Sequence, residues 1–212
     1  MPTLYIVATP IGNLEDITLR ALRVFKEVDL ILCEDTRVTR KLLAHYKIST
    51  PARSYNEMPS GMPEEQVLAL LQEGKNLALV SDAGTPGISD PGARLVGNVK
   101  VQMPNVKVVP VPGPSALTAA LSVSGISGDE FLFLGFLPHK KGRATVIKEI
   151  LESKRPVVFF ESPYRVEKTL EALKSKKVVI ARELTKIFEE VYEVGEAPTQ
   201  GRGEFVVIVL PW

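Results

Sequence analysis

The sequence predicts an α/β protein, because apolar runs of strand length alternate along the chain with longer segments of helical spacing. The early apolar runs contain almost no polar residue, which is typical of parallel strands that are buried on both faces. Longer polar stretches separate the later runs. We therefore expect a mostly parallel N-terminal sheet and a mixed, partly antiparallel C-terminal sheet.

The individual elements follow from these patterns. Runs with strand composition occupy residues 4–8, 30–33, 77–80, 106–111, 131–136, 157–160, 178–181 and 205–210, and a further strand is expected around Val191. Apolar residues recur with helical spacing at 19–28, 67–71, 146–151 and 166–173, and His45 lies on another expected helix. Helices are predicted to begin at Asp90-Pro91, Gly113-Pro114 and Ser162-Pro163, where a capping residue or glycine precedes proline.

Two prolines and a glycine interrupt the pattern near residues 111–114, and this break predicts two α/β lobes. We place the lobes at 1–111 and 112–212 and expect a cleft between them. No apolar stretch approaches the roughly 20 residues that span a bilayer, and Cys33 is the only cysteine, which fits a reducing compartment. The sequence therefore predicts a cytoplasmic enzyme.

Charge and metal chemistry restrict the candidates further. The net charge is only +1, so any contact with nucleic acid must come from local basic clusters. The few histidines and the cysteine are scattered without the spacing of a zinc site, and we predict no metal. The chain also lacks the glycine-rich fingerprint of dinucleotide-binding folds and the P-loop of NTPases, which disfavours both classes.

Small and turn-forming residues follow several of the predicted strands. The most informative segment is 80–92, where Asp82 to Pro86 favour ligand binding over scaffold and Asp90 is interpreted as a helix cap. Segments 9–13 and 109–116 each fit a plain turn or linker as well as a ligand-binding loop. In an α/β sheet, ligands collect where the carboxyl ends of strands meet such loops.

Charged residues follow other strands. Glu34, Asp35 and Arg37 fit either a capped helix with a local ion pair or a functional site, and their position at a strand's carboxyl end favours function. The cluster Lys140, Lys141 and Arg143 is either a solvated loop or, with a neighbouring aromatic, a grip on RNA phosphates and a stacked base.

Together these stretches resemble the ribosomal RNA 2′-O-methyltransferase I family of the tetrapyrrole (corrin/porphyrin) methylase superfamily. The matching segments, in order along the chain, are Thr9-Pro10-Ile11-Gly12-Asn13-Leu14 with Asp16-Ile17-Thr18, Glu34-Asp35-Thr36-Arg37, Ser81-Asp82-Ala83-Gly84-Thr85-Pro86, Asp90-Pro91-Gly92, Pro112-Gly113-Pro114-Ser115-Ala116, Gly135-Phe136-Leu137-Pro138, Phe160-Glu161-Ser162, Ala181-Arg182-Glu183-Leu184-Thr185-Lys186 and Gly203-Glu204-Phe205. The resemblance covers essentially the whole chain.

The resemblance implies a two-lobed tetrapyrrole-methylase-like fold, a homodimer, and S-adenosylmethionine in the cleft. It implies that the donor contacts Pro10, Gly12, Asp82, Ala83, Gly84, Thr85, Pro86, Pro112, Ser115 and Ala116. The implied acceptor is a cytidine ribose of 16S rRNA in the small ribosomal subunit. Members often continue into a C-terminal helical extension, whereas this sequence stops at Trp212 after its last predicted strand. We therefore expect any RNA affinity of that extension to be absent or supplied otherwise.

A ribose hydroxyl is a poor nucleophile, so a base or a stabilising cation is expected beside it. The candidates for that role are Glu34, Asp35, Glu183 and Lys186. The candidates for RNA binding are Arg37, Lys140, Lys141, Arg143 and Arg182. Two alternatives stay open: a methyltransferase of the same superfamily acting on a corrin or porphyrin precursor, and a non-catalytic RNA-binding assembly factor.

Overall fold

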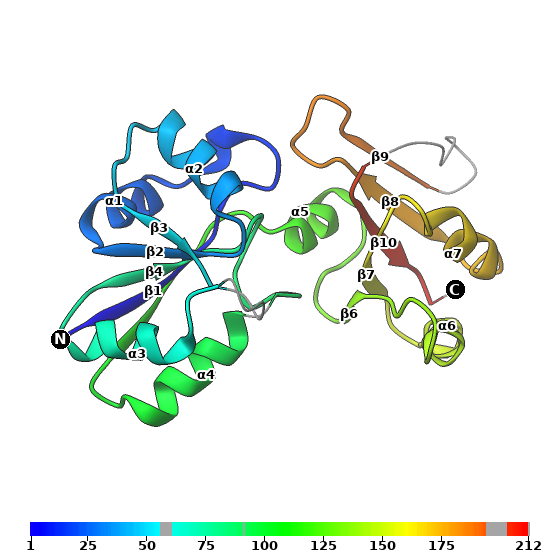
Figure 1. Cartoon of the computed structure of the whole chain (residues 1–212). Helices are drawn as coiled ribbons and strands as arrows, with labels where there is room; N and C mark the ends of the chain where they lie inside the picture. Colours follow the sequence, from blue (N-terminus) through cyan, green and yellow to red (C-terminus); the bar gives the residue numbers. More distant parts are fainter. Residues whose placement is uncertain (56–60, 91, 194–202, 212) are drawn as a thin grey trace. The chain divides into compact units, whose positions relative to one another are not determined.

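A computed structural model of the chain describes residues 1–55, 61–90, 92–193 and 203–211. The chain folds as two units, Met1–Ser115 and Ala116–Trp212 (Figure 1). The first unit thus extends slightly beyond the lobe boundary that the sequence predicts. No helix in the described residues is long and apolar enough to cross a membrane.

The first unit is built on a five-stranded sheet with the strand order β3-β2-β4-β1-β5. Its strands are β1 (Thr3–Val7), β2 (Leu30–Cys33), β3 (Ala52–Ser54), β4 (Leu77–Leu79) and β5 (Lys107–Val111). Every neighbouring pair is parallel, which confirms the predicted parallel N-terminal sheet. All carboxyl ends therefore lie at one edge of the sheet.

Helices cover both faces of this sheet (Figure 1). They are α1 (Leu19–Glu27), α2 (Thr36–His45), α3 (Glu64–Gln72) and α4 (Gly92–Gln102), and a short 3₁₀ helix, η1 (Leu14–Asp16), precedes α1. Alternate residues of β1 point to opposite faces, as the pleat requires. Val7 packs with Phe25 of α1 in one apolar cluster, whereas Leu4 packs with Leu71 and Leu95 in the other.

The second unit contains a mixed sheet with the order β6-β7-β10-β8-β9. Its elements are α5 (Ala116–Val123), β6 (Leu132–Phe136), α6 (Arg143–Glu152), β7 (Val157–Glu161), α7 (Val166–Ala172), β8 (Val178–Arg182), β9 (Glu190–Glu193) and β10 (Phe205–Val209). β6 and β7 are parallel, and β10 runs antiparallel between β7 and β8. This arrangement confirms the predicted mixed sheet, including the strand around Val191.

Two local features differ from the predictions. β3 is an edge strand that the sequence patterns do not predict. It has three residues with the charged Arg53 at its centre, so it contains no apolar run. The helix predicted at Ser162-Pro163 begins only at Val166, after a turn in which the Ser162 carbonyl accepts from the amides of Arg165 and Val166. The cap predicted at Asp90 is confirmed, since its carboxylate accepts hydrogen bonds from the amides of Gly87 and Gly92 at 2.6 and 2.7 Å. Pro91 of that predicted start lies outside the described residues.

Candidate active site

Four predicted loops meet at the carboxyl edge of the first unit's sheet. They follow β2, β4, β1 and β5, which are consecutive in the strand order although they lie far apart in the sequence. Parallel pairing brings the loop that begins at Thr9 beside those that begin at Ser81 and Pro112. Ligands of α/β proteins bind at this edge, so the fold gathers the first unit's predicted donor-binding residues in the expected place.

Hydrogen bonds join these loops directly. The backbones of Thr9 and Gly84 exchange two hydrogen bonds, with N···O distances of 2.9 and 3.0 Å. The Thr9 hydroxyl donates to the carbonyl of Ser81 at 3.1 Å, and the Thr85 hydroxyl donates to the carbonyl of Pro114 at 3.1 Å. Gly84 has a φ of +83°, a left-handed conformation that a residue with a side chain rarely adopts. The loops therefore form one connected, rigid surface.

Gly113 lets the loops after β1 and β5 approach closely. A Cβ atom at this position would lie 3.0 Å from the Cβ of Ala8. We expect Gly113→Ala to lower the free energy of unfolding by about 1–2 kcal/mol, because the crowded backbones must move apart.

A matched control is available in the same unit. A Cβ atom at Gly97, in the interior of α4, would meet nothing within 4 Å. Gly97→Ala should therefore raise the free energy of unfolding by up to about 1 kcal/mol, through the helix propensity of alanine. Urea unfolding of both variants measures the two effects, and equal effects on stability would contradict the close packing at Gly113.

Two carboxylates and the backbone of their loops form the polar centre of this edge. The Glu34 carboxylate follows β2 and accepts a hydrogen bond from the amide of Asp82 at 3.2 Å. The Asp82 carboxylate follows β4 and accepts one from the amide of Asp35 at 2.9 Å. Each loop thus fixes the acidic side chain of the other, and the two carboxylates are held near each other.

The surroundings raise the pKa of both carboxyl groups. Partial burial is the main cause at Glu34, and the negative charges of Asp82 and Asp90 add to it. Partial burial is also the main cause at Asp82, with a further contribution from the charge of Asp35. A raised pKa makes a carboxylate a stronger base. It also favours a positively charged ligand, which would relieve the repulsion between the two groups.

Asp35 and Arg37 have a local structural role. The Asp35 carboxylate caps α2 by accepting from the amide of Arg37 at 2.7 Å, and it forms an ion pair with the Arg37 guanidinium at 2.6 Å. These hydrogen bonds lower the pKa of Asp35 to about 2. A carboxylate with so low a pKa is a weak base, so Glu34 is the better candidate for proton transfer in this unit.

The second unit also gathers predicted residues at one edge of its sheet. β6, β7 and β8 all run in the same direction, so the loops that follow them lie at the same edge. Glu183 and Lys186 follow β8, and their side chains form an ion pair at 2.9 Å. Lys186 also contacts the Glu204 carboxylate at 3.1 Å.

The Glu183–Lys186 pair is ionised on both sides. Burial raises the pKa of Glu183, but hydrogen bonds from Lys186 and from the amide of Glu204 outweigh it and leave the pKa lowered. Burial lowers the pKa of Lys186, but its two carboxylate partners outweigh it and leave the pKa raised. Lys186 is therefore held as a cation, which fits charge stabilisation and not proton abstraction. Glu204 lies in the matching Gly203-Glu204-Phe205 segment, which carried no predicted role, and it is the second carboxylate partner of Lys186.

Two of the arginines predicted to bind RNA are engaged inside the second unit. The Arg143 guanidinium forms an ion pair with the fully buried Glu161 carboxylate at 2.9 Å. The Arg182 guanidinium forms one with Glu190 at 2.9 Å and lies over the ring of Phe205. Only 16% of each arginine side chain is exposed. Both arginines thus have carboxylate partners within the unit, and their contact with RNA stays a prediction.

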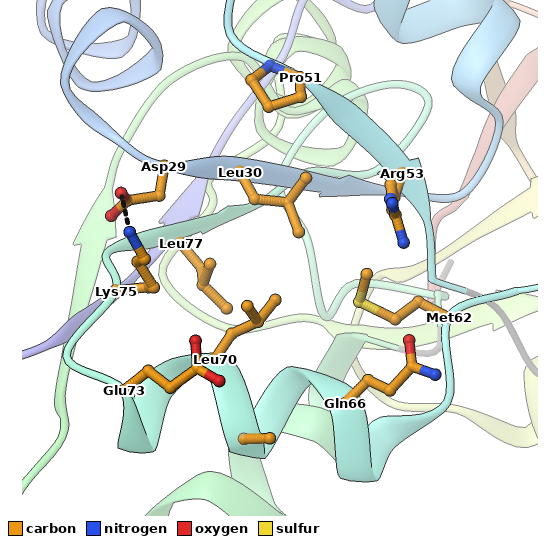
Figure 2. A pocket seen from close by; sticks show the side chains of 11 residues that line it. Asp29, Leu30, Pro51, Arg53, Met62, Gln66, Leu70, Glu73, Lys75 and Leu77 are labelled. Atoms are coloured by element: carbon orange, nitrogen blue, oxygen red, sulfur yellow. Dashed lines mark hydrogen bonds and ion pairs between the residues drawn. The ribbon is translucent and has the colours of Figure 1, made fainter.

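A cavity of about 490 Å³ lies elsewhere in the first unit, between α3 and the strands β2 and β4 (Figure 2). Leu30 and Leu77, the first residues of β2 and β4, line it, so part of the cavity lies beside the amino ends of these strands. Its Lys75 and Asp29 side chains already form an ion pair at 3.2 Å. None of the predicted site residues lines this cavity.

Comparisons with known proteins find relatives that match nearly the whole chain. The family model described as Tetrapyrrole (Corrin/Porphyrin) Methylases matches residues 3–198. A Thermotoga maritima protein named Ribosomal RNA small subunit methyltransferase I is 50% identical over 203 residues, which cover 93% of this chain and 90% of the relative. A protein of the same name from Mesorhizobium japonicum is 46% identical, over 99% of this chain and 76% of its own length.

Solved structures with low sequence identity share the fold. A diphthine synthase has a TM-score of 0.73 at 16% identity, with 98% of this chain and 89% of that chain covered. The methyltransferase CobJ has a TM-score of 0.70 at 16% identity, with 99% and 94% covered. At this level of identity the likeness establishes the architecture alone.

Proposed function

We propose a function for this chain from one premise: it belongs to the tetrapyrrole (corrin/porphyrin) methylase family. The protein transfers a methyl group from S-adenosylmethionine to the ribose 2′-hydroxyl of a cytidine in small-subunit (16S) ribosomal RNA. It acts as a homodimer on the small subunit in the cytoplasm. The names of the relatives, which are 43–50% identical, support the substrate class.

One structural observation carries this proposal: four loops meet at the carboxyl edge of the parallel sheet and hold Glu34 and Asp82 in reciprocal hydrogen bonds. Phosphate-binding sites of α/β proteins depend on glycine-rich helix N-termini that favour anions. The polar centre here is acidic instead, and it suits a cationic ligand that carries hydroxyl groups. A sulfonium donor with an ammonium and ribose hydroxyls is such a ligand.

The residues of this edge fit S-adenosylmethionine. The donor carries an ammonium, two ribose hydroxyls and an electrophilic methyl group on a positively charged sulfur. The Asp82 carboxylate is half-buried and can accept from an ammonium or a hydroxyl. The remaining donor contacts are assigned to the loops that follow β1, β4 and β5, which hydrogen bonds join to one another. They are Pro10, Gly12, Ala83, Gly84, Thr85, Pro86, Pro112, Ser115 and Ala116, the first residue of α5.

Proton removal from the acceptor is assigned to Glu34. Burial raises the pKa of this carboxyl, so it is a stronger base than a solvated glutamate. Glu183 and Lys186, which form an ion pair in the second unit, stay the alternative candidates for the base and for a stabilising cation. Lys140 and Lys141 are exposed and are assigned to RNA phosphates. Arg37 is also exposed and stays a candidate for the same role, with its guanidinium held by Asp35.

Methyl transfer from labelled S-adenosylmethionine tests the proposed function. Small ribosomal subunits that lack the modification should accept label at a cytidine ribose, and mapping of the product should place it on the 2′-oxygen. Free ribosomal RNA and a tetrapyrrole precursor serve as alternative acceptors. Label in the tetrapyrrole alone would replace this function with small-molecule methylation, and no transfer to any acceptor would favour an assembly factor.

A further inference from the structure

Two aromatic side chains are exposed beside the basic loop of the second unit. Phe136 ends β6 and is 57% exposed, and Tyr164 lies in the turn after β7 and is 96% exposed. Aromatic rings of this size usually contribute to cores or to interfaces. Because β6 and β7 are parallel neighbours, both rings belong to the same edge of the sheet. Neither aromatic has a role in the site described so far.

The buried Glu161 fixes the two turns that carry these rings. Its carboxylate has no exposed surface and pairs with Arg143 at 2.9 Å and with Arg165 at 2.8 Å. Arg143 also donates to the carbonyl of Pro138 at 3.0 Å, and Arg165 donates to the carbonyl of Leu137 at 3.3 Å. The residues that follow Phe136 and Tyr164 are thus joined through one anchor.

The ring of Phe136 packs against a neighbouring aromatic ring. It lies 5.4 Å from the ring of Phe160, whose own ring is 5.1 Å from that of Phe133 in an edge-to-face contact. This row of rings holds Phe136 in place while more than half of its surface stays in solvent. A ring that is fixed and exposed offers a stacking surface without a large loss of side-chain entropy.

Positive charge accompanies the exposed rings. Lys140 and Lys141 are exposed on the turn between β6 and α6, directly after the segment that Arg143 anchors. In the part of the chain that the structure describes, neither lysine forms an ion pair with a carboxylate. Exposed rings beside unpaired cations are the combination by which proteins bind single-stranded nucleic acid. A protein partner would instead favour an apolar patch with few charges.

We propose that Phe136 and Tyr164 stack on unpaired bases of the RNA substrate while Lys140 and Lys141 contact the adjoining phosphates. Glu161 is a positioning residue, because it holds both turns through its arginines. The inference rests on the proposed function and adds a selection rule to it. The enzyme selects an RNA segment whose bases are already unpaired or can be unstacked.

Alanine substitutions at the two aromatic positions test this proposal. Phe136→Ala and Tyr164→Ala should each weaken binding of a single-stranded RNA oligonucleotide containing the target cytidine by about 10-fold. The KM for RNA should rise while kcat and the affinity for S-adenosylmethionine stay unchanged. Phe136→Tyr and Tyr164→Phe are the matched controls, and they should retain binding because they keep a ring.

A fully paired RNA duplex of the same sequence separates stacking from charge. Its binding should be insensitive to the aromatic substitutions but should weaken in the double variant Lys140→Gln, Lys141→Gln. Unchanged RNA affinity and KM in the alanine variants would overturn the proposal, and so would a loss confined to binding of ribosomal proteins. Failure of the proposed function is distinguishable, because then the unmodified enzyme itself would not methylate RNA.

Discussion

Replacing Asp82 by asparagine is expected to weaken the binding of S-adenosylmethionine on the order of 10- to 100-fold. Asparagine keeps the oxygen that accepts from the amide of Asp35, so the local hydrogen bond survives. It removes the negative charge that we assign to the cationic donor. Burial raises the pKa of Asp82, which means that its ionised form costs stability at neutral pH. The melting temperature of the variant should therefore equal or exceed that of the unmodified protein.

The pH dependence of binding provides a second readout for Asp82. Because its pKa is raised above the usual 3.8, the carboxylate protonates at a higher pH than a solvated aspartate does. Donor affinity should be full above this raised pKa and fall as the pH drops through it. Isothermal titration over a pH series should show less of this decrease in Asp82→Asn. Asp29→Asn, which removes the same charge just before β2, is the matched control and should bind the donor normally.

Replacing Glu34 by glutamine is expected to reduce turnover by roughly 100- to 10,000-fold, the usual contribution of a general base. Glutamine has nearly the same shape and can still accept from the amide of Asp82. The affinity for S-adenosylmethionine should change little, so the loss should appear in kcat. Single-turnover methylation at saturating donor and RNA isolates the chemical step. The unmodified enzyme should also lose rate as the pH falls through the raised pKa of Glu34.

Glu183→Gln serves as the comparison for Glu34→Gln. Glutamine has nearly the same size as Glu183, the second candidate base, but lacks the negative charge that pairs with Lys186. We expect a smaller loss of turnover than at Glu34, because the lowered pKa of Glu183 makes it a weaker base. Full turnover in Glu34→Gln together with a large loss in Glu183→Gln would contradict our assignment of the base.

The strands and the loops that follow them could be predicted because local sequence encodes them. β1 and β2 are almost wholly apolar, as strands buried on both faces must be, and proline and glycine mark where the chain leaves the sheet. The loop from Asp82 to Pro86 could be singled out for the same reason. Asp90 was assigned correctly to capping, because the pattern of an acidic residue before a helix is local.

The remaining features depend on partners that are distant in the sequence. The sequence around Arg143 shows a basic cluster, but the Arg143 guanidinium forms an ion pair with the buried Glu161 at the end of β7. Arg182 is likewise paired with Glu190 on the neighbouring strand. β3 is defined by pairing with β2 and not by its own composition. Arg143 is mostly buried in an ion pair, whereas Lys140 is exposed, and this difference in burial is set by the tertiary structure and not by the local sequence.

A structure with bound donor tests the central claim most directly. Crystals of the protein soaked with S-adenosylmethionine or with its demethylated product should show the molecule at the carboxyl edge of the first unit's sheet, in contact with Asp82 and with the loops after β1 and β5. Titration in solution should give binding that Asp82→Asn weakens and Asp29→Asn does not. Binding at another place, or no binding of either compound, would contradict the account.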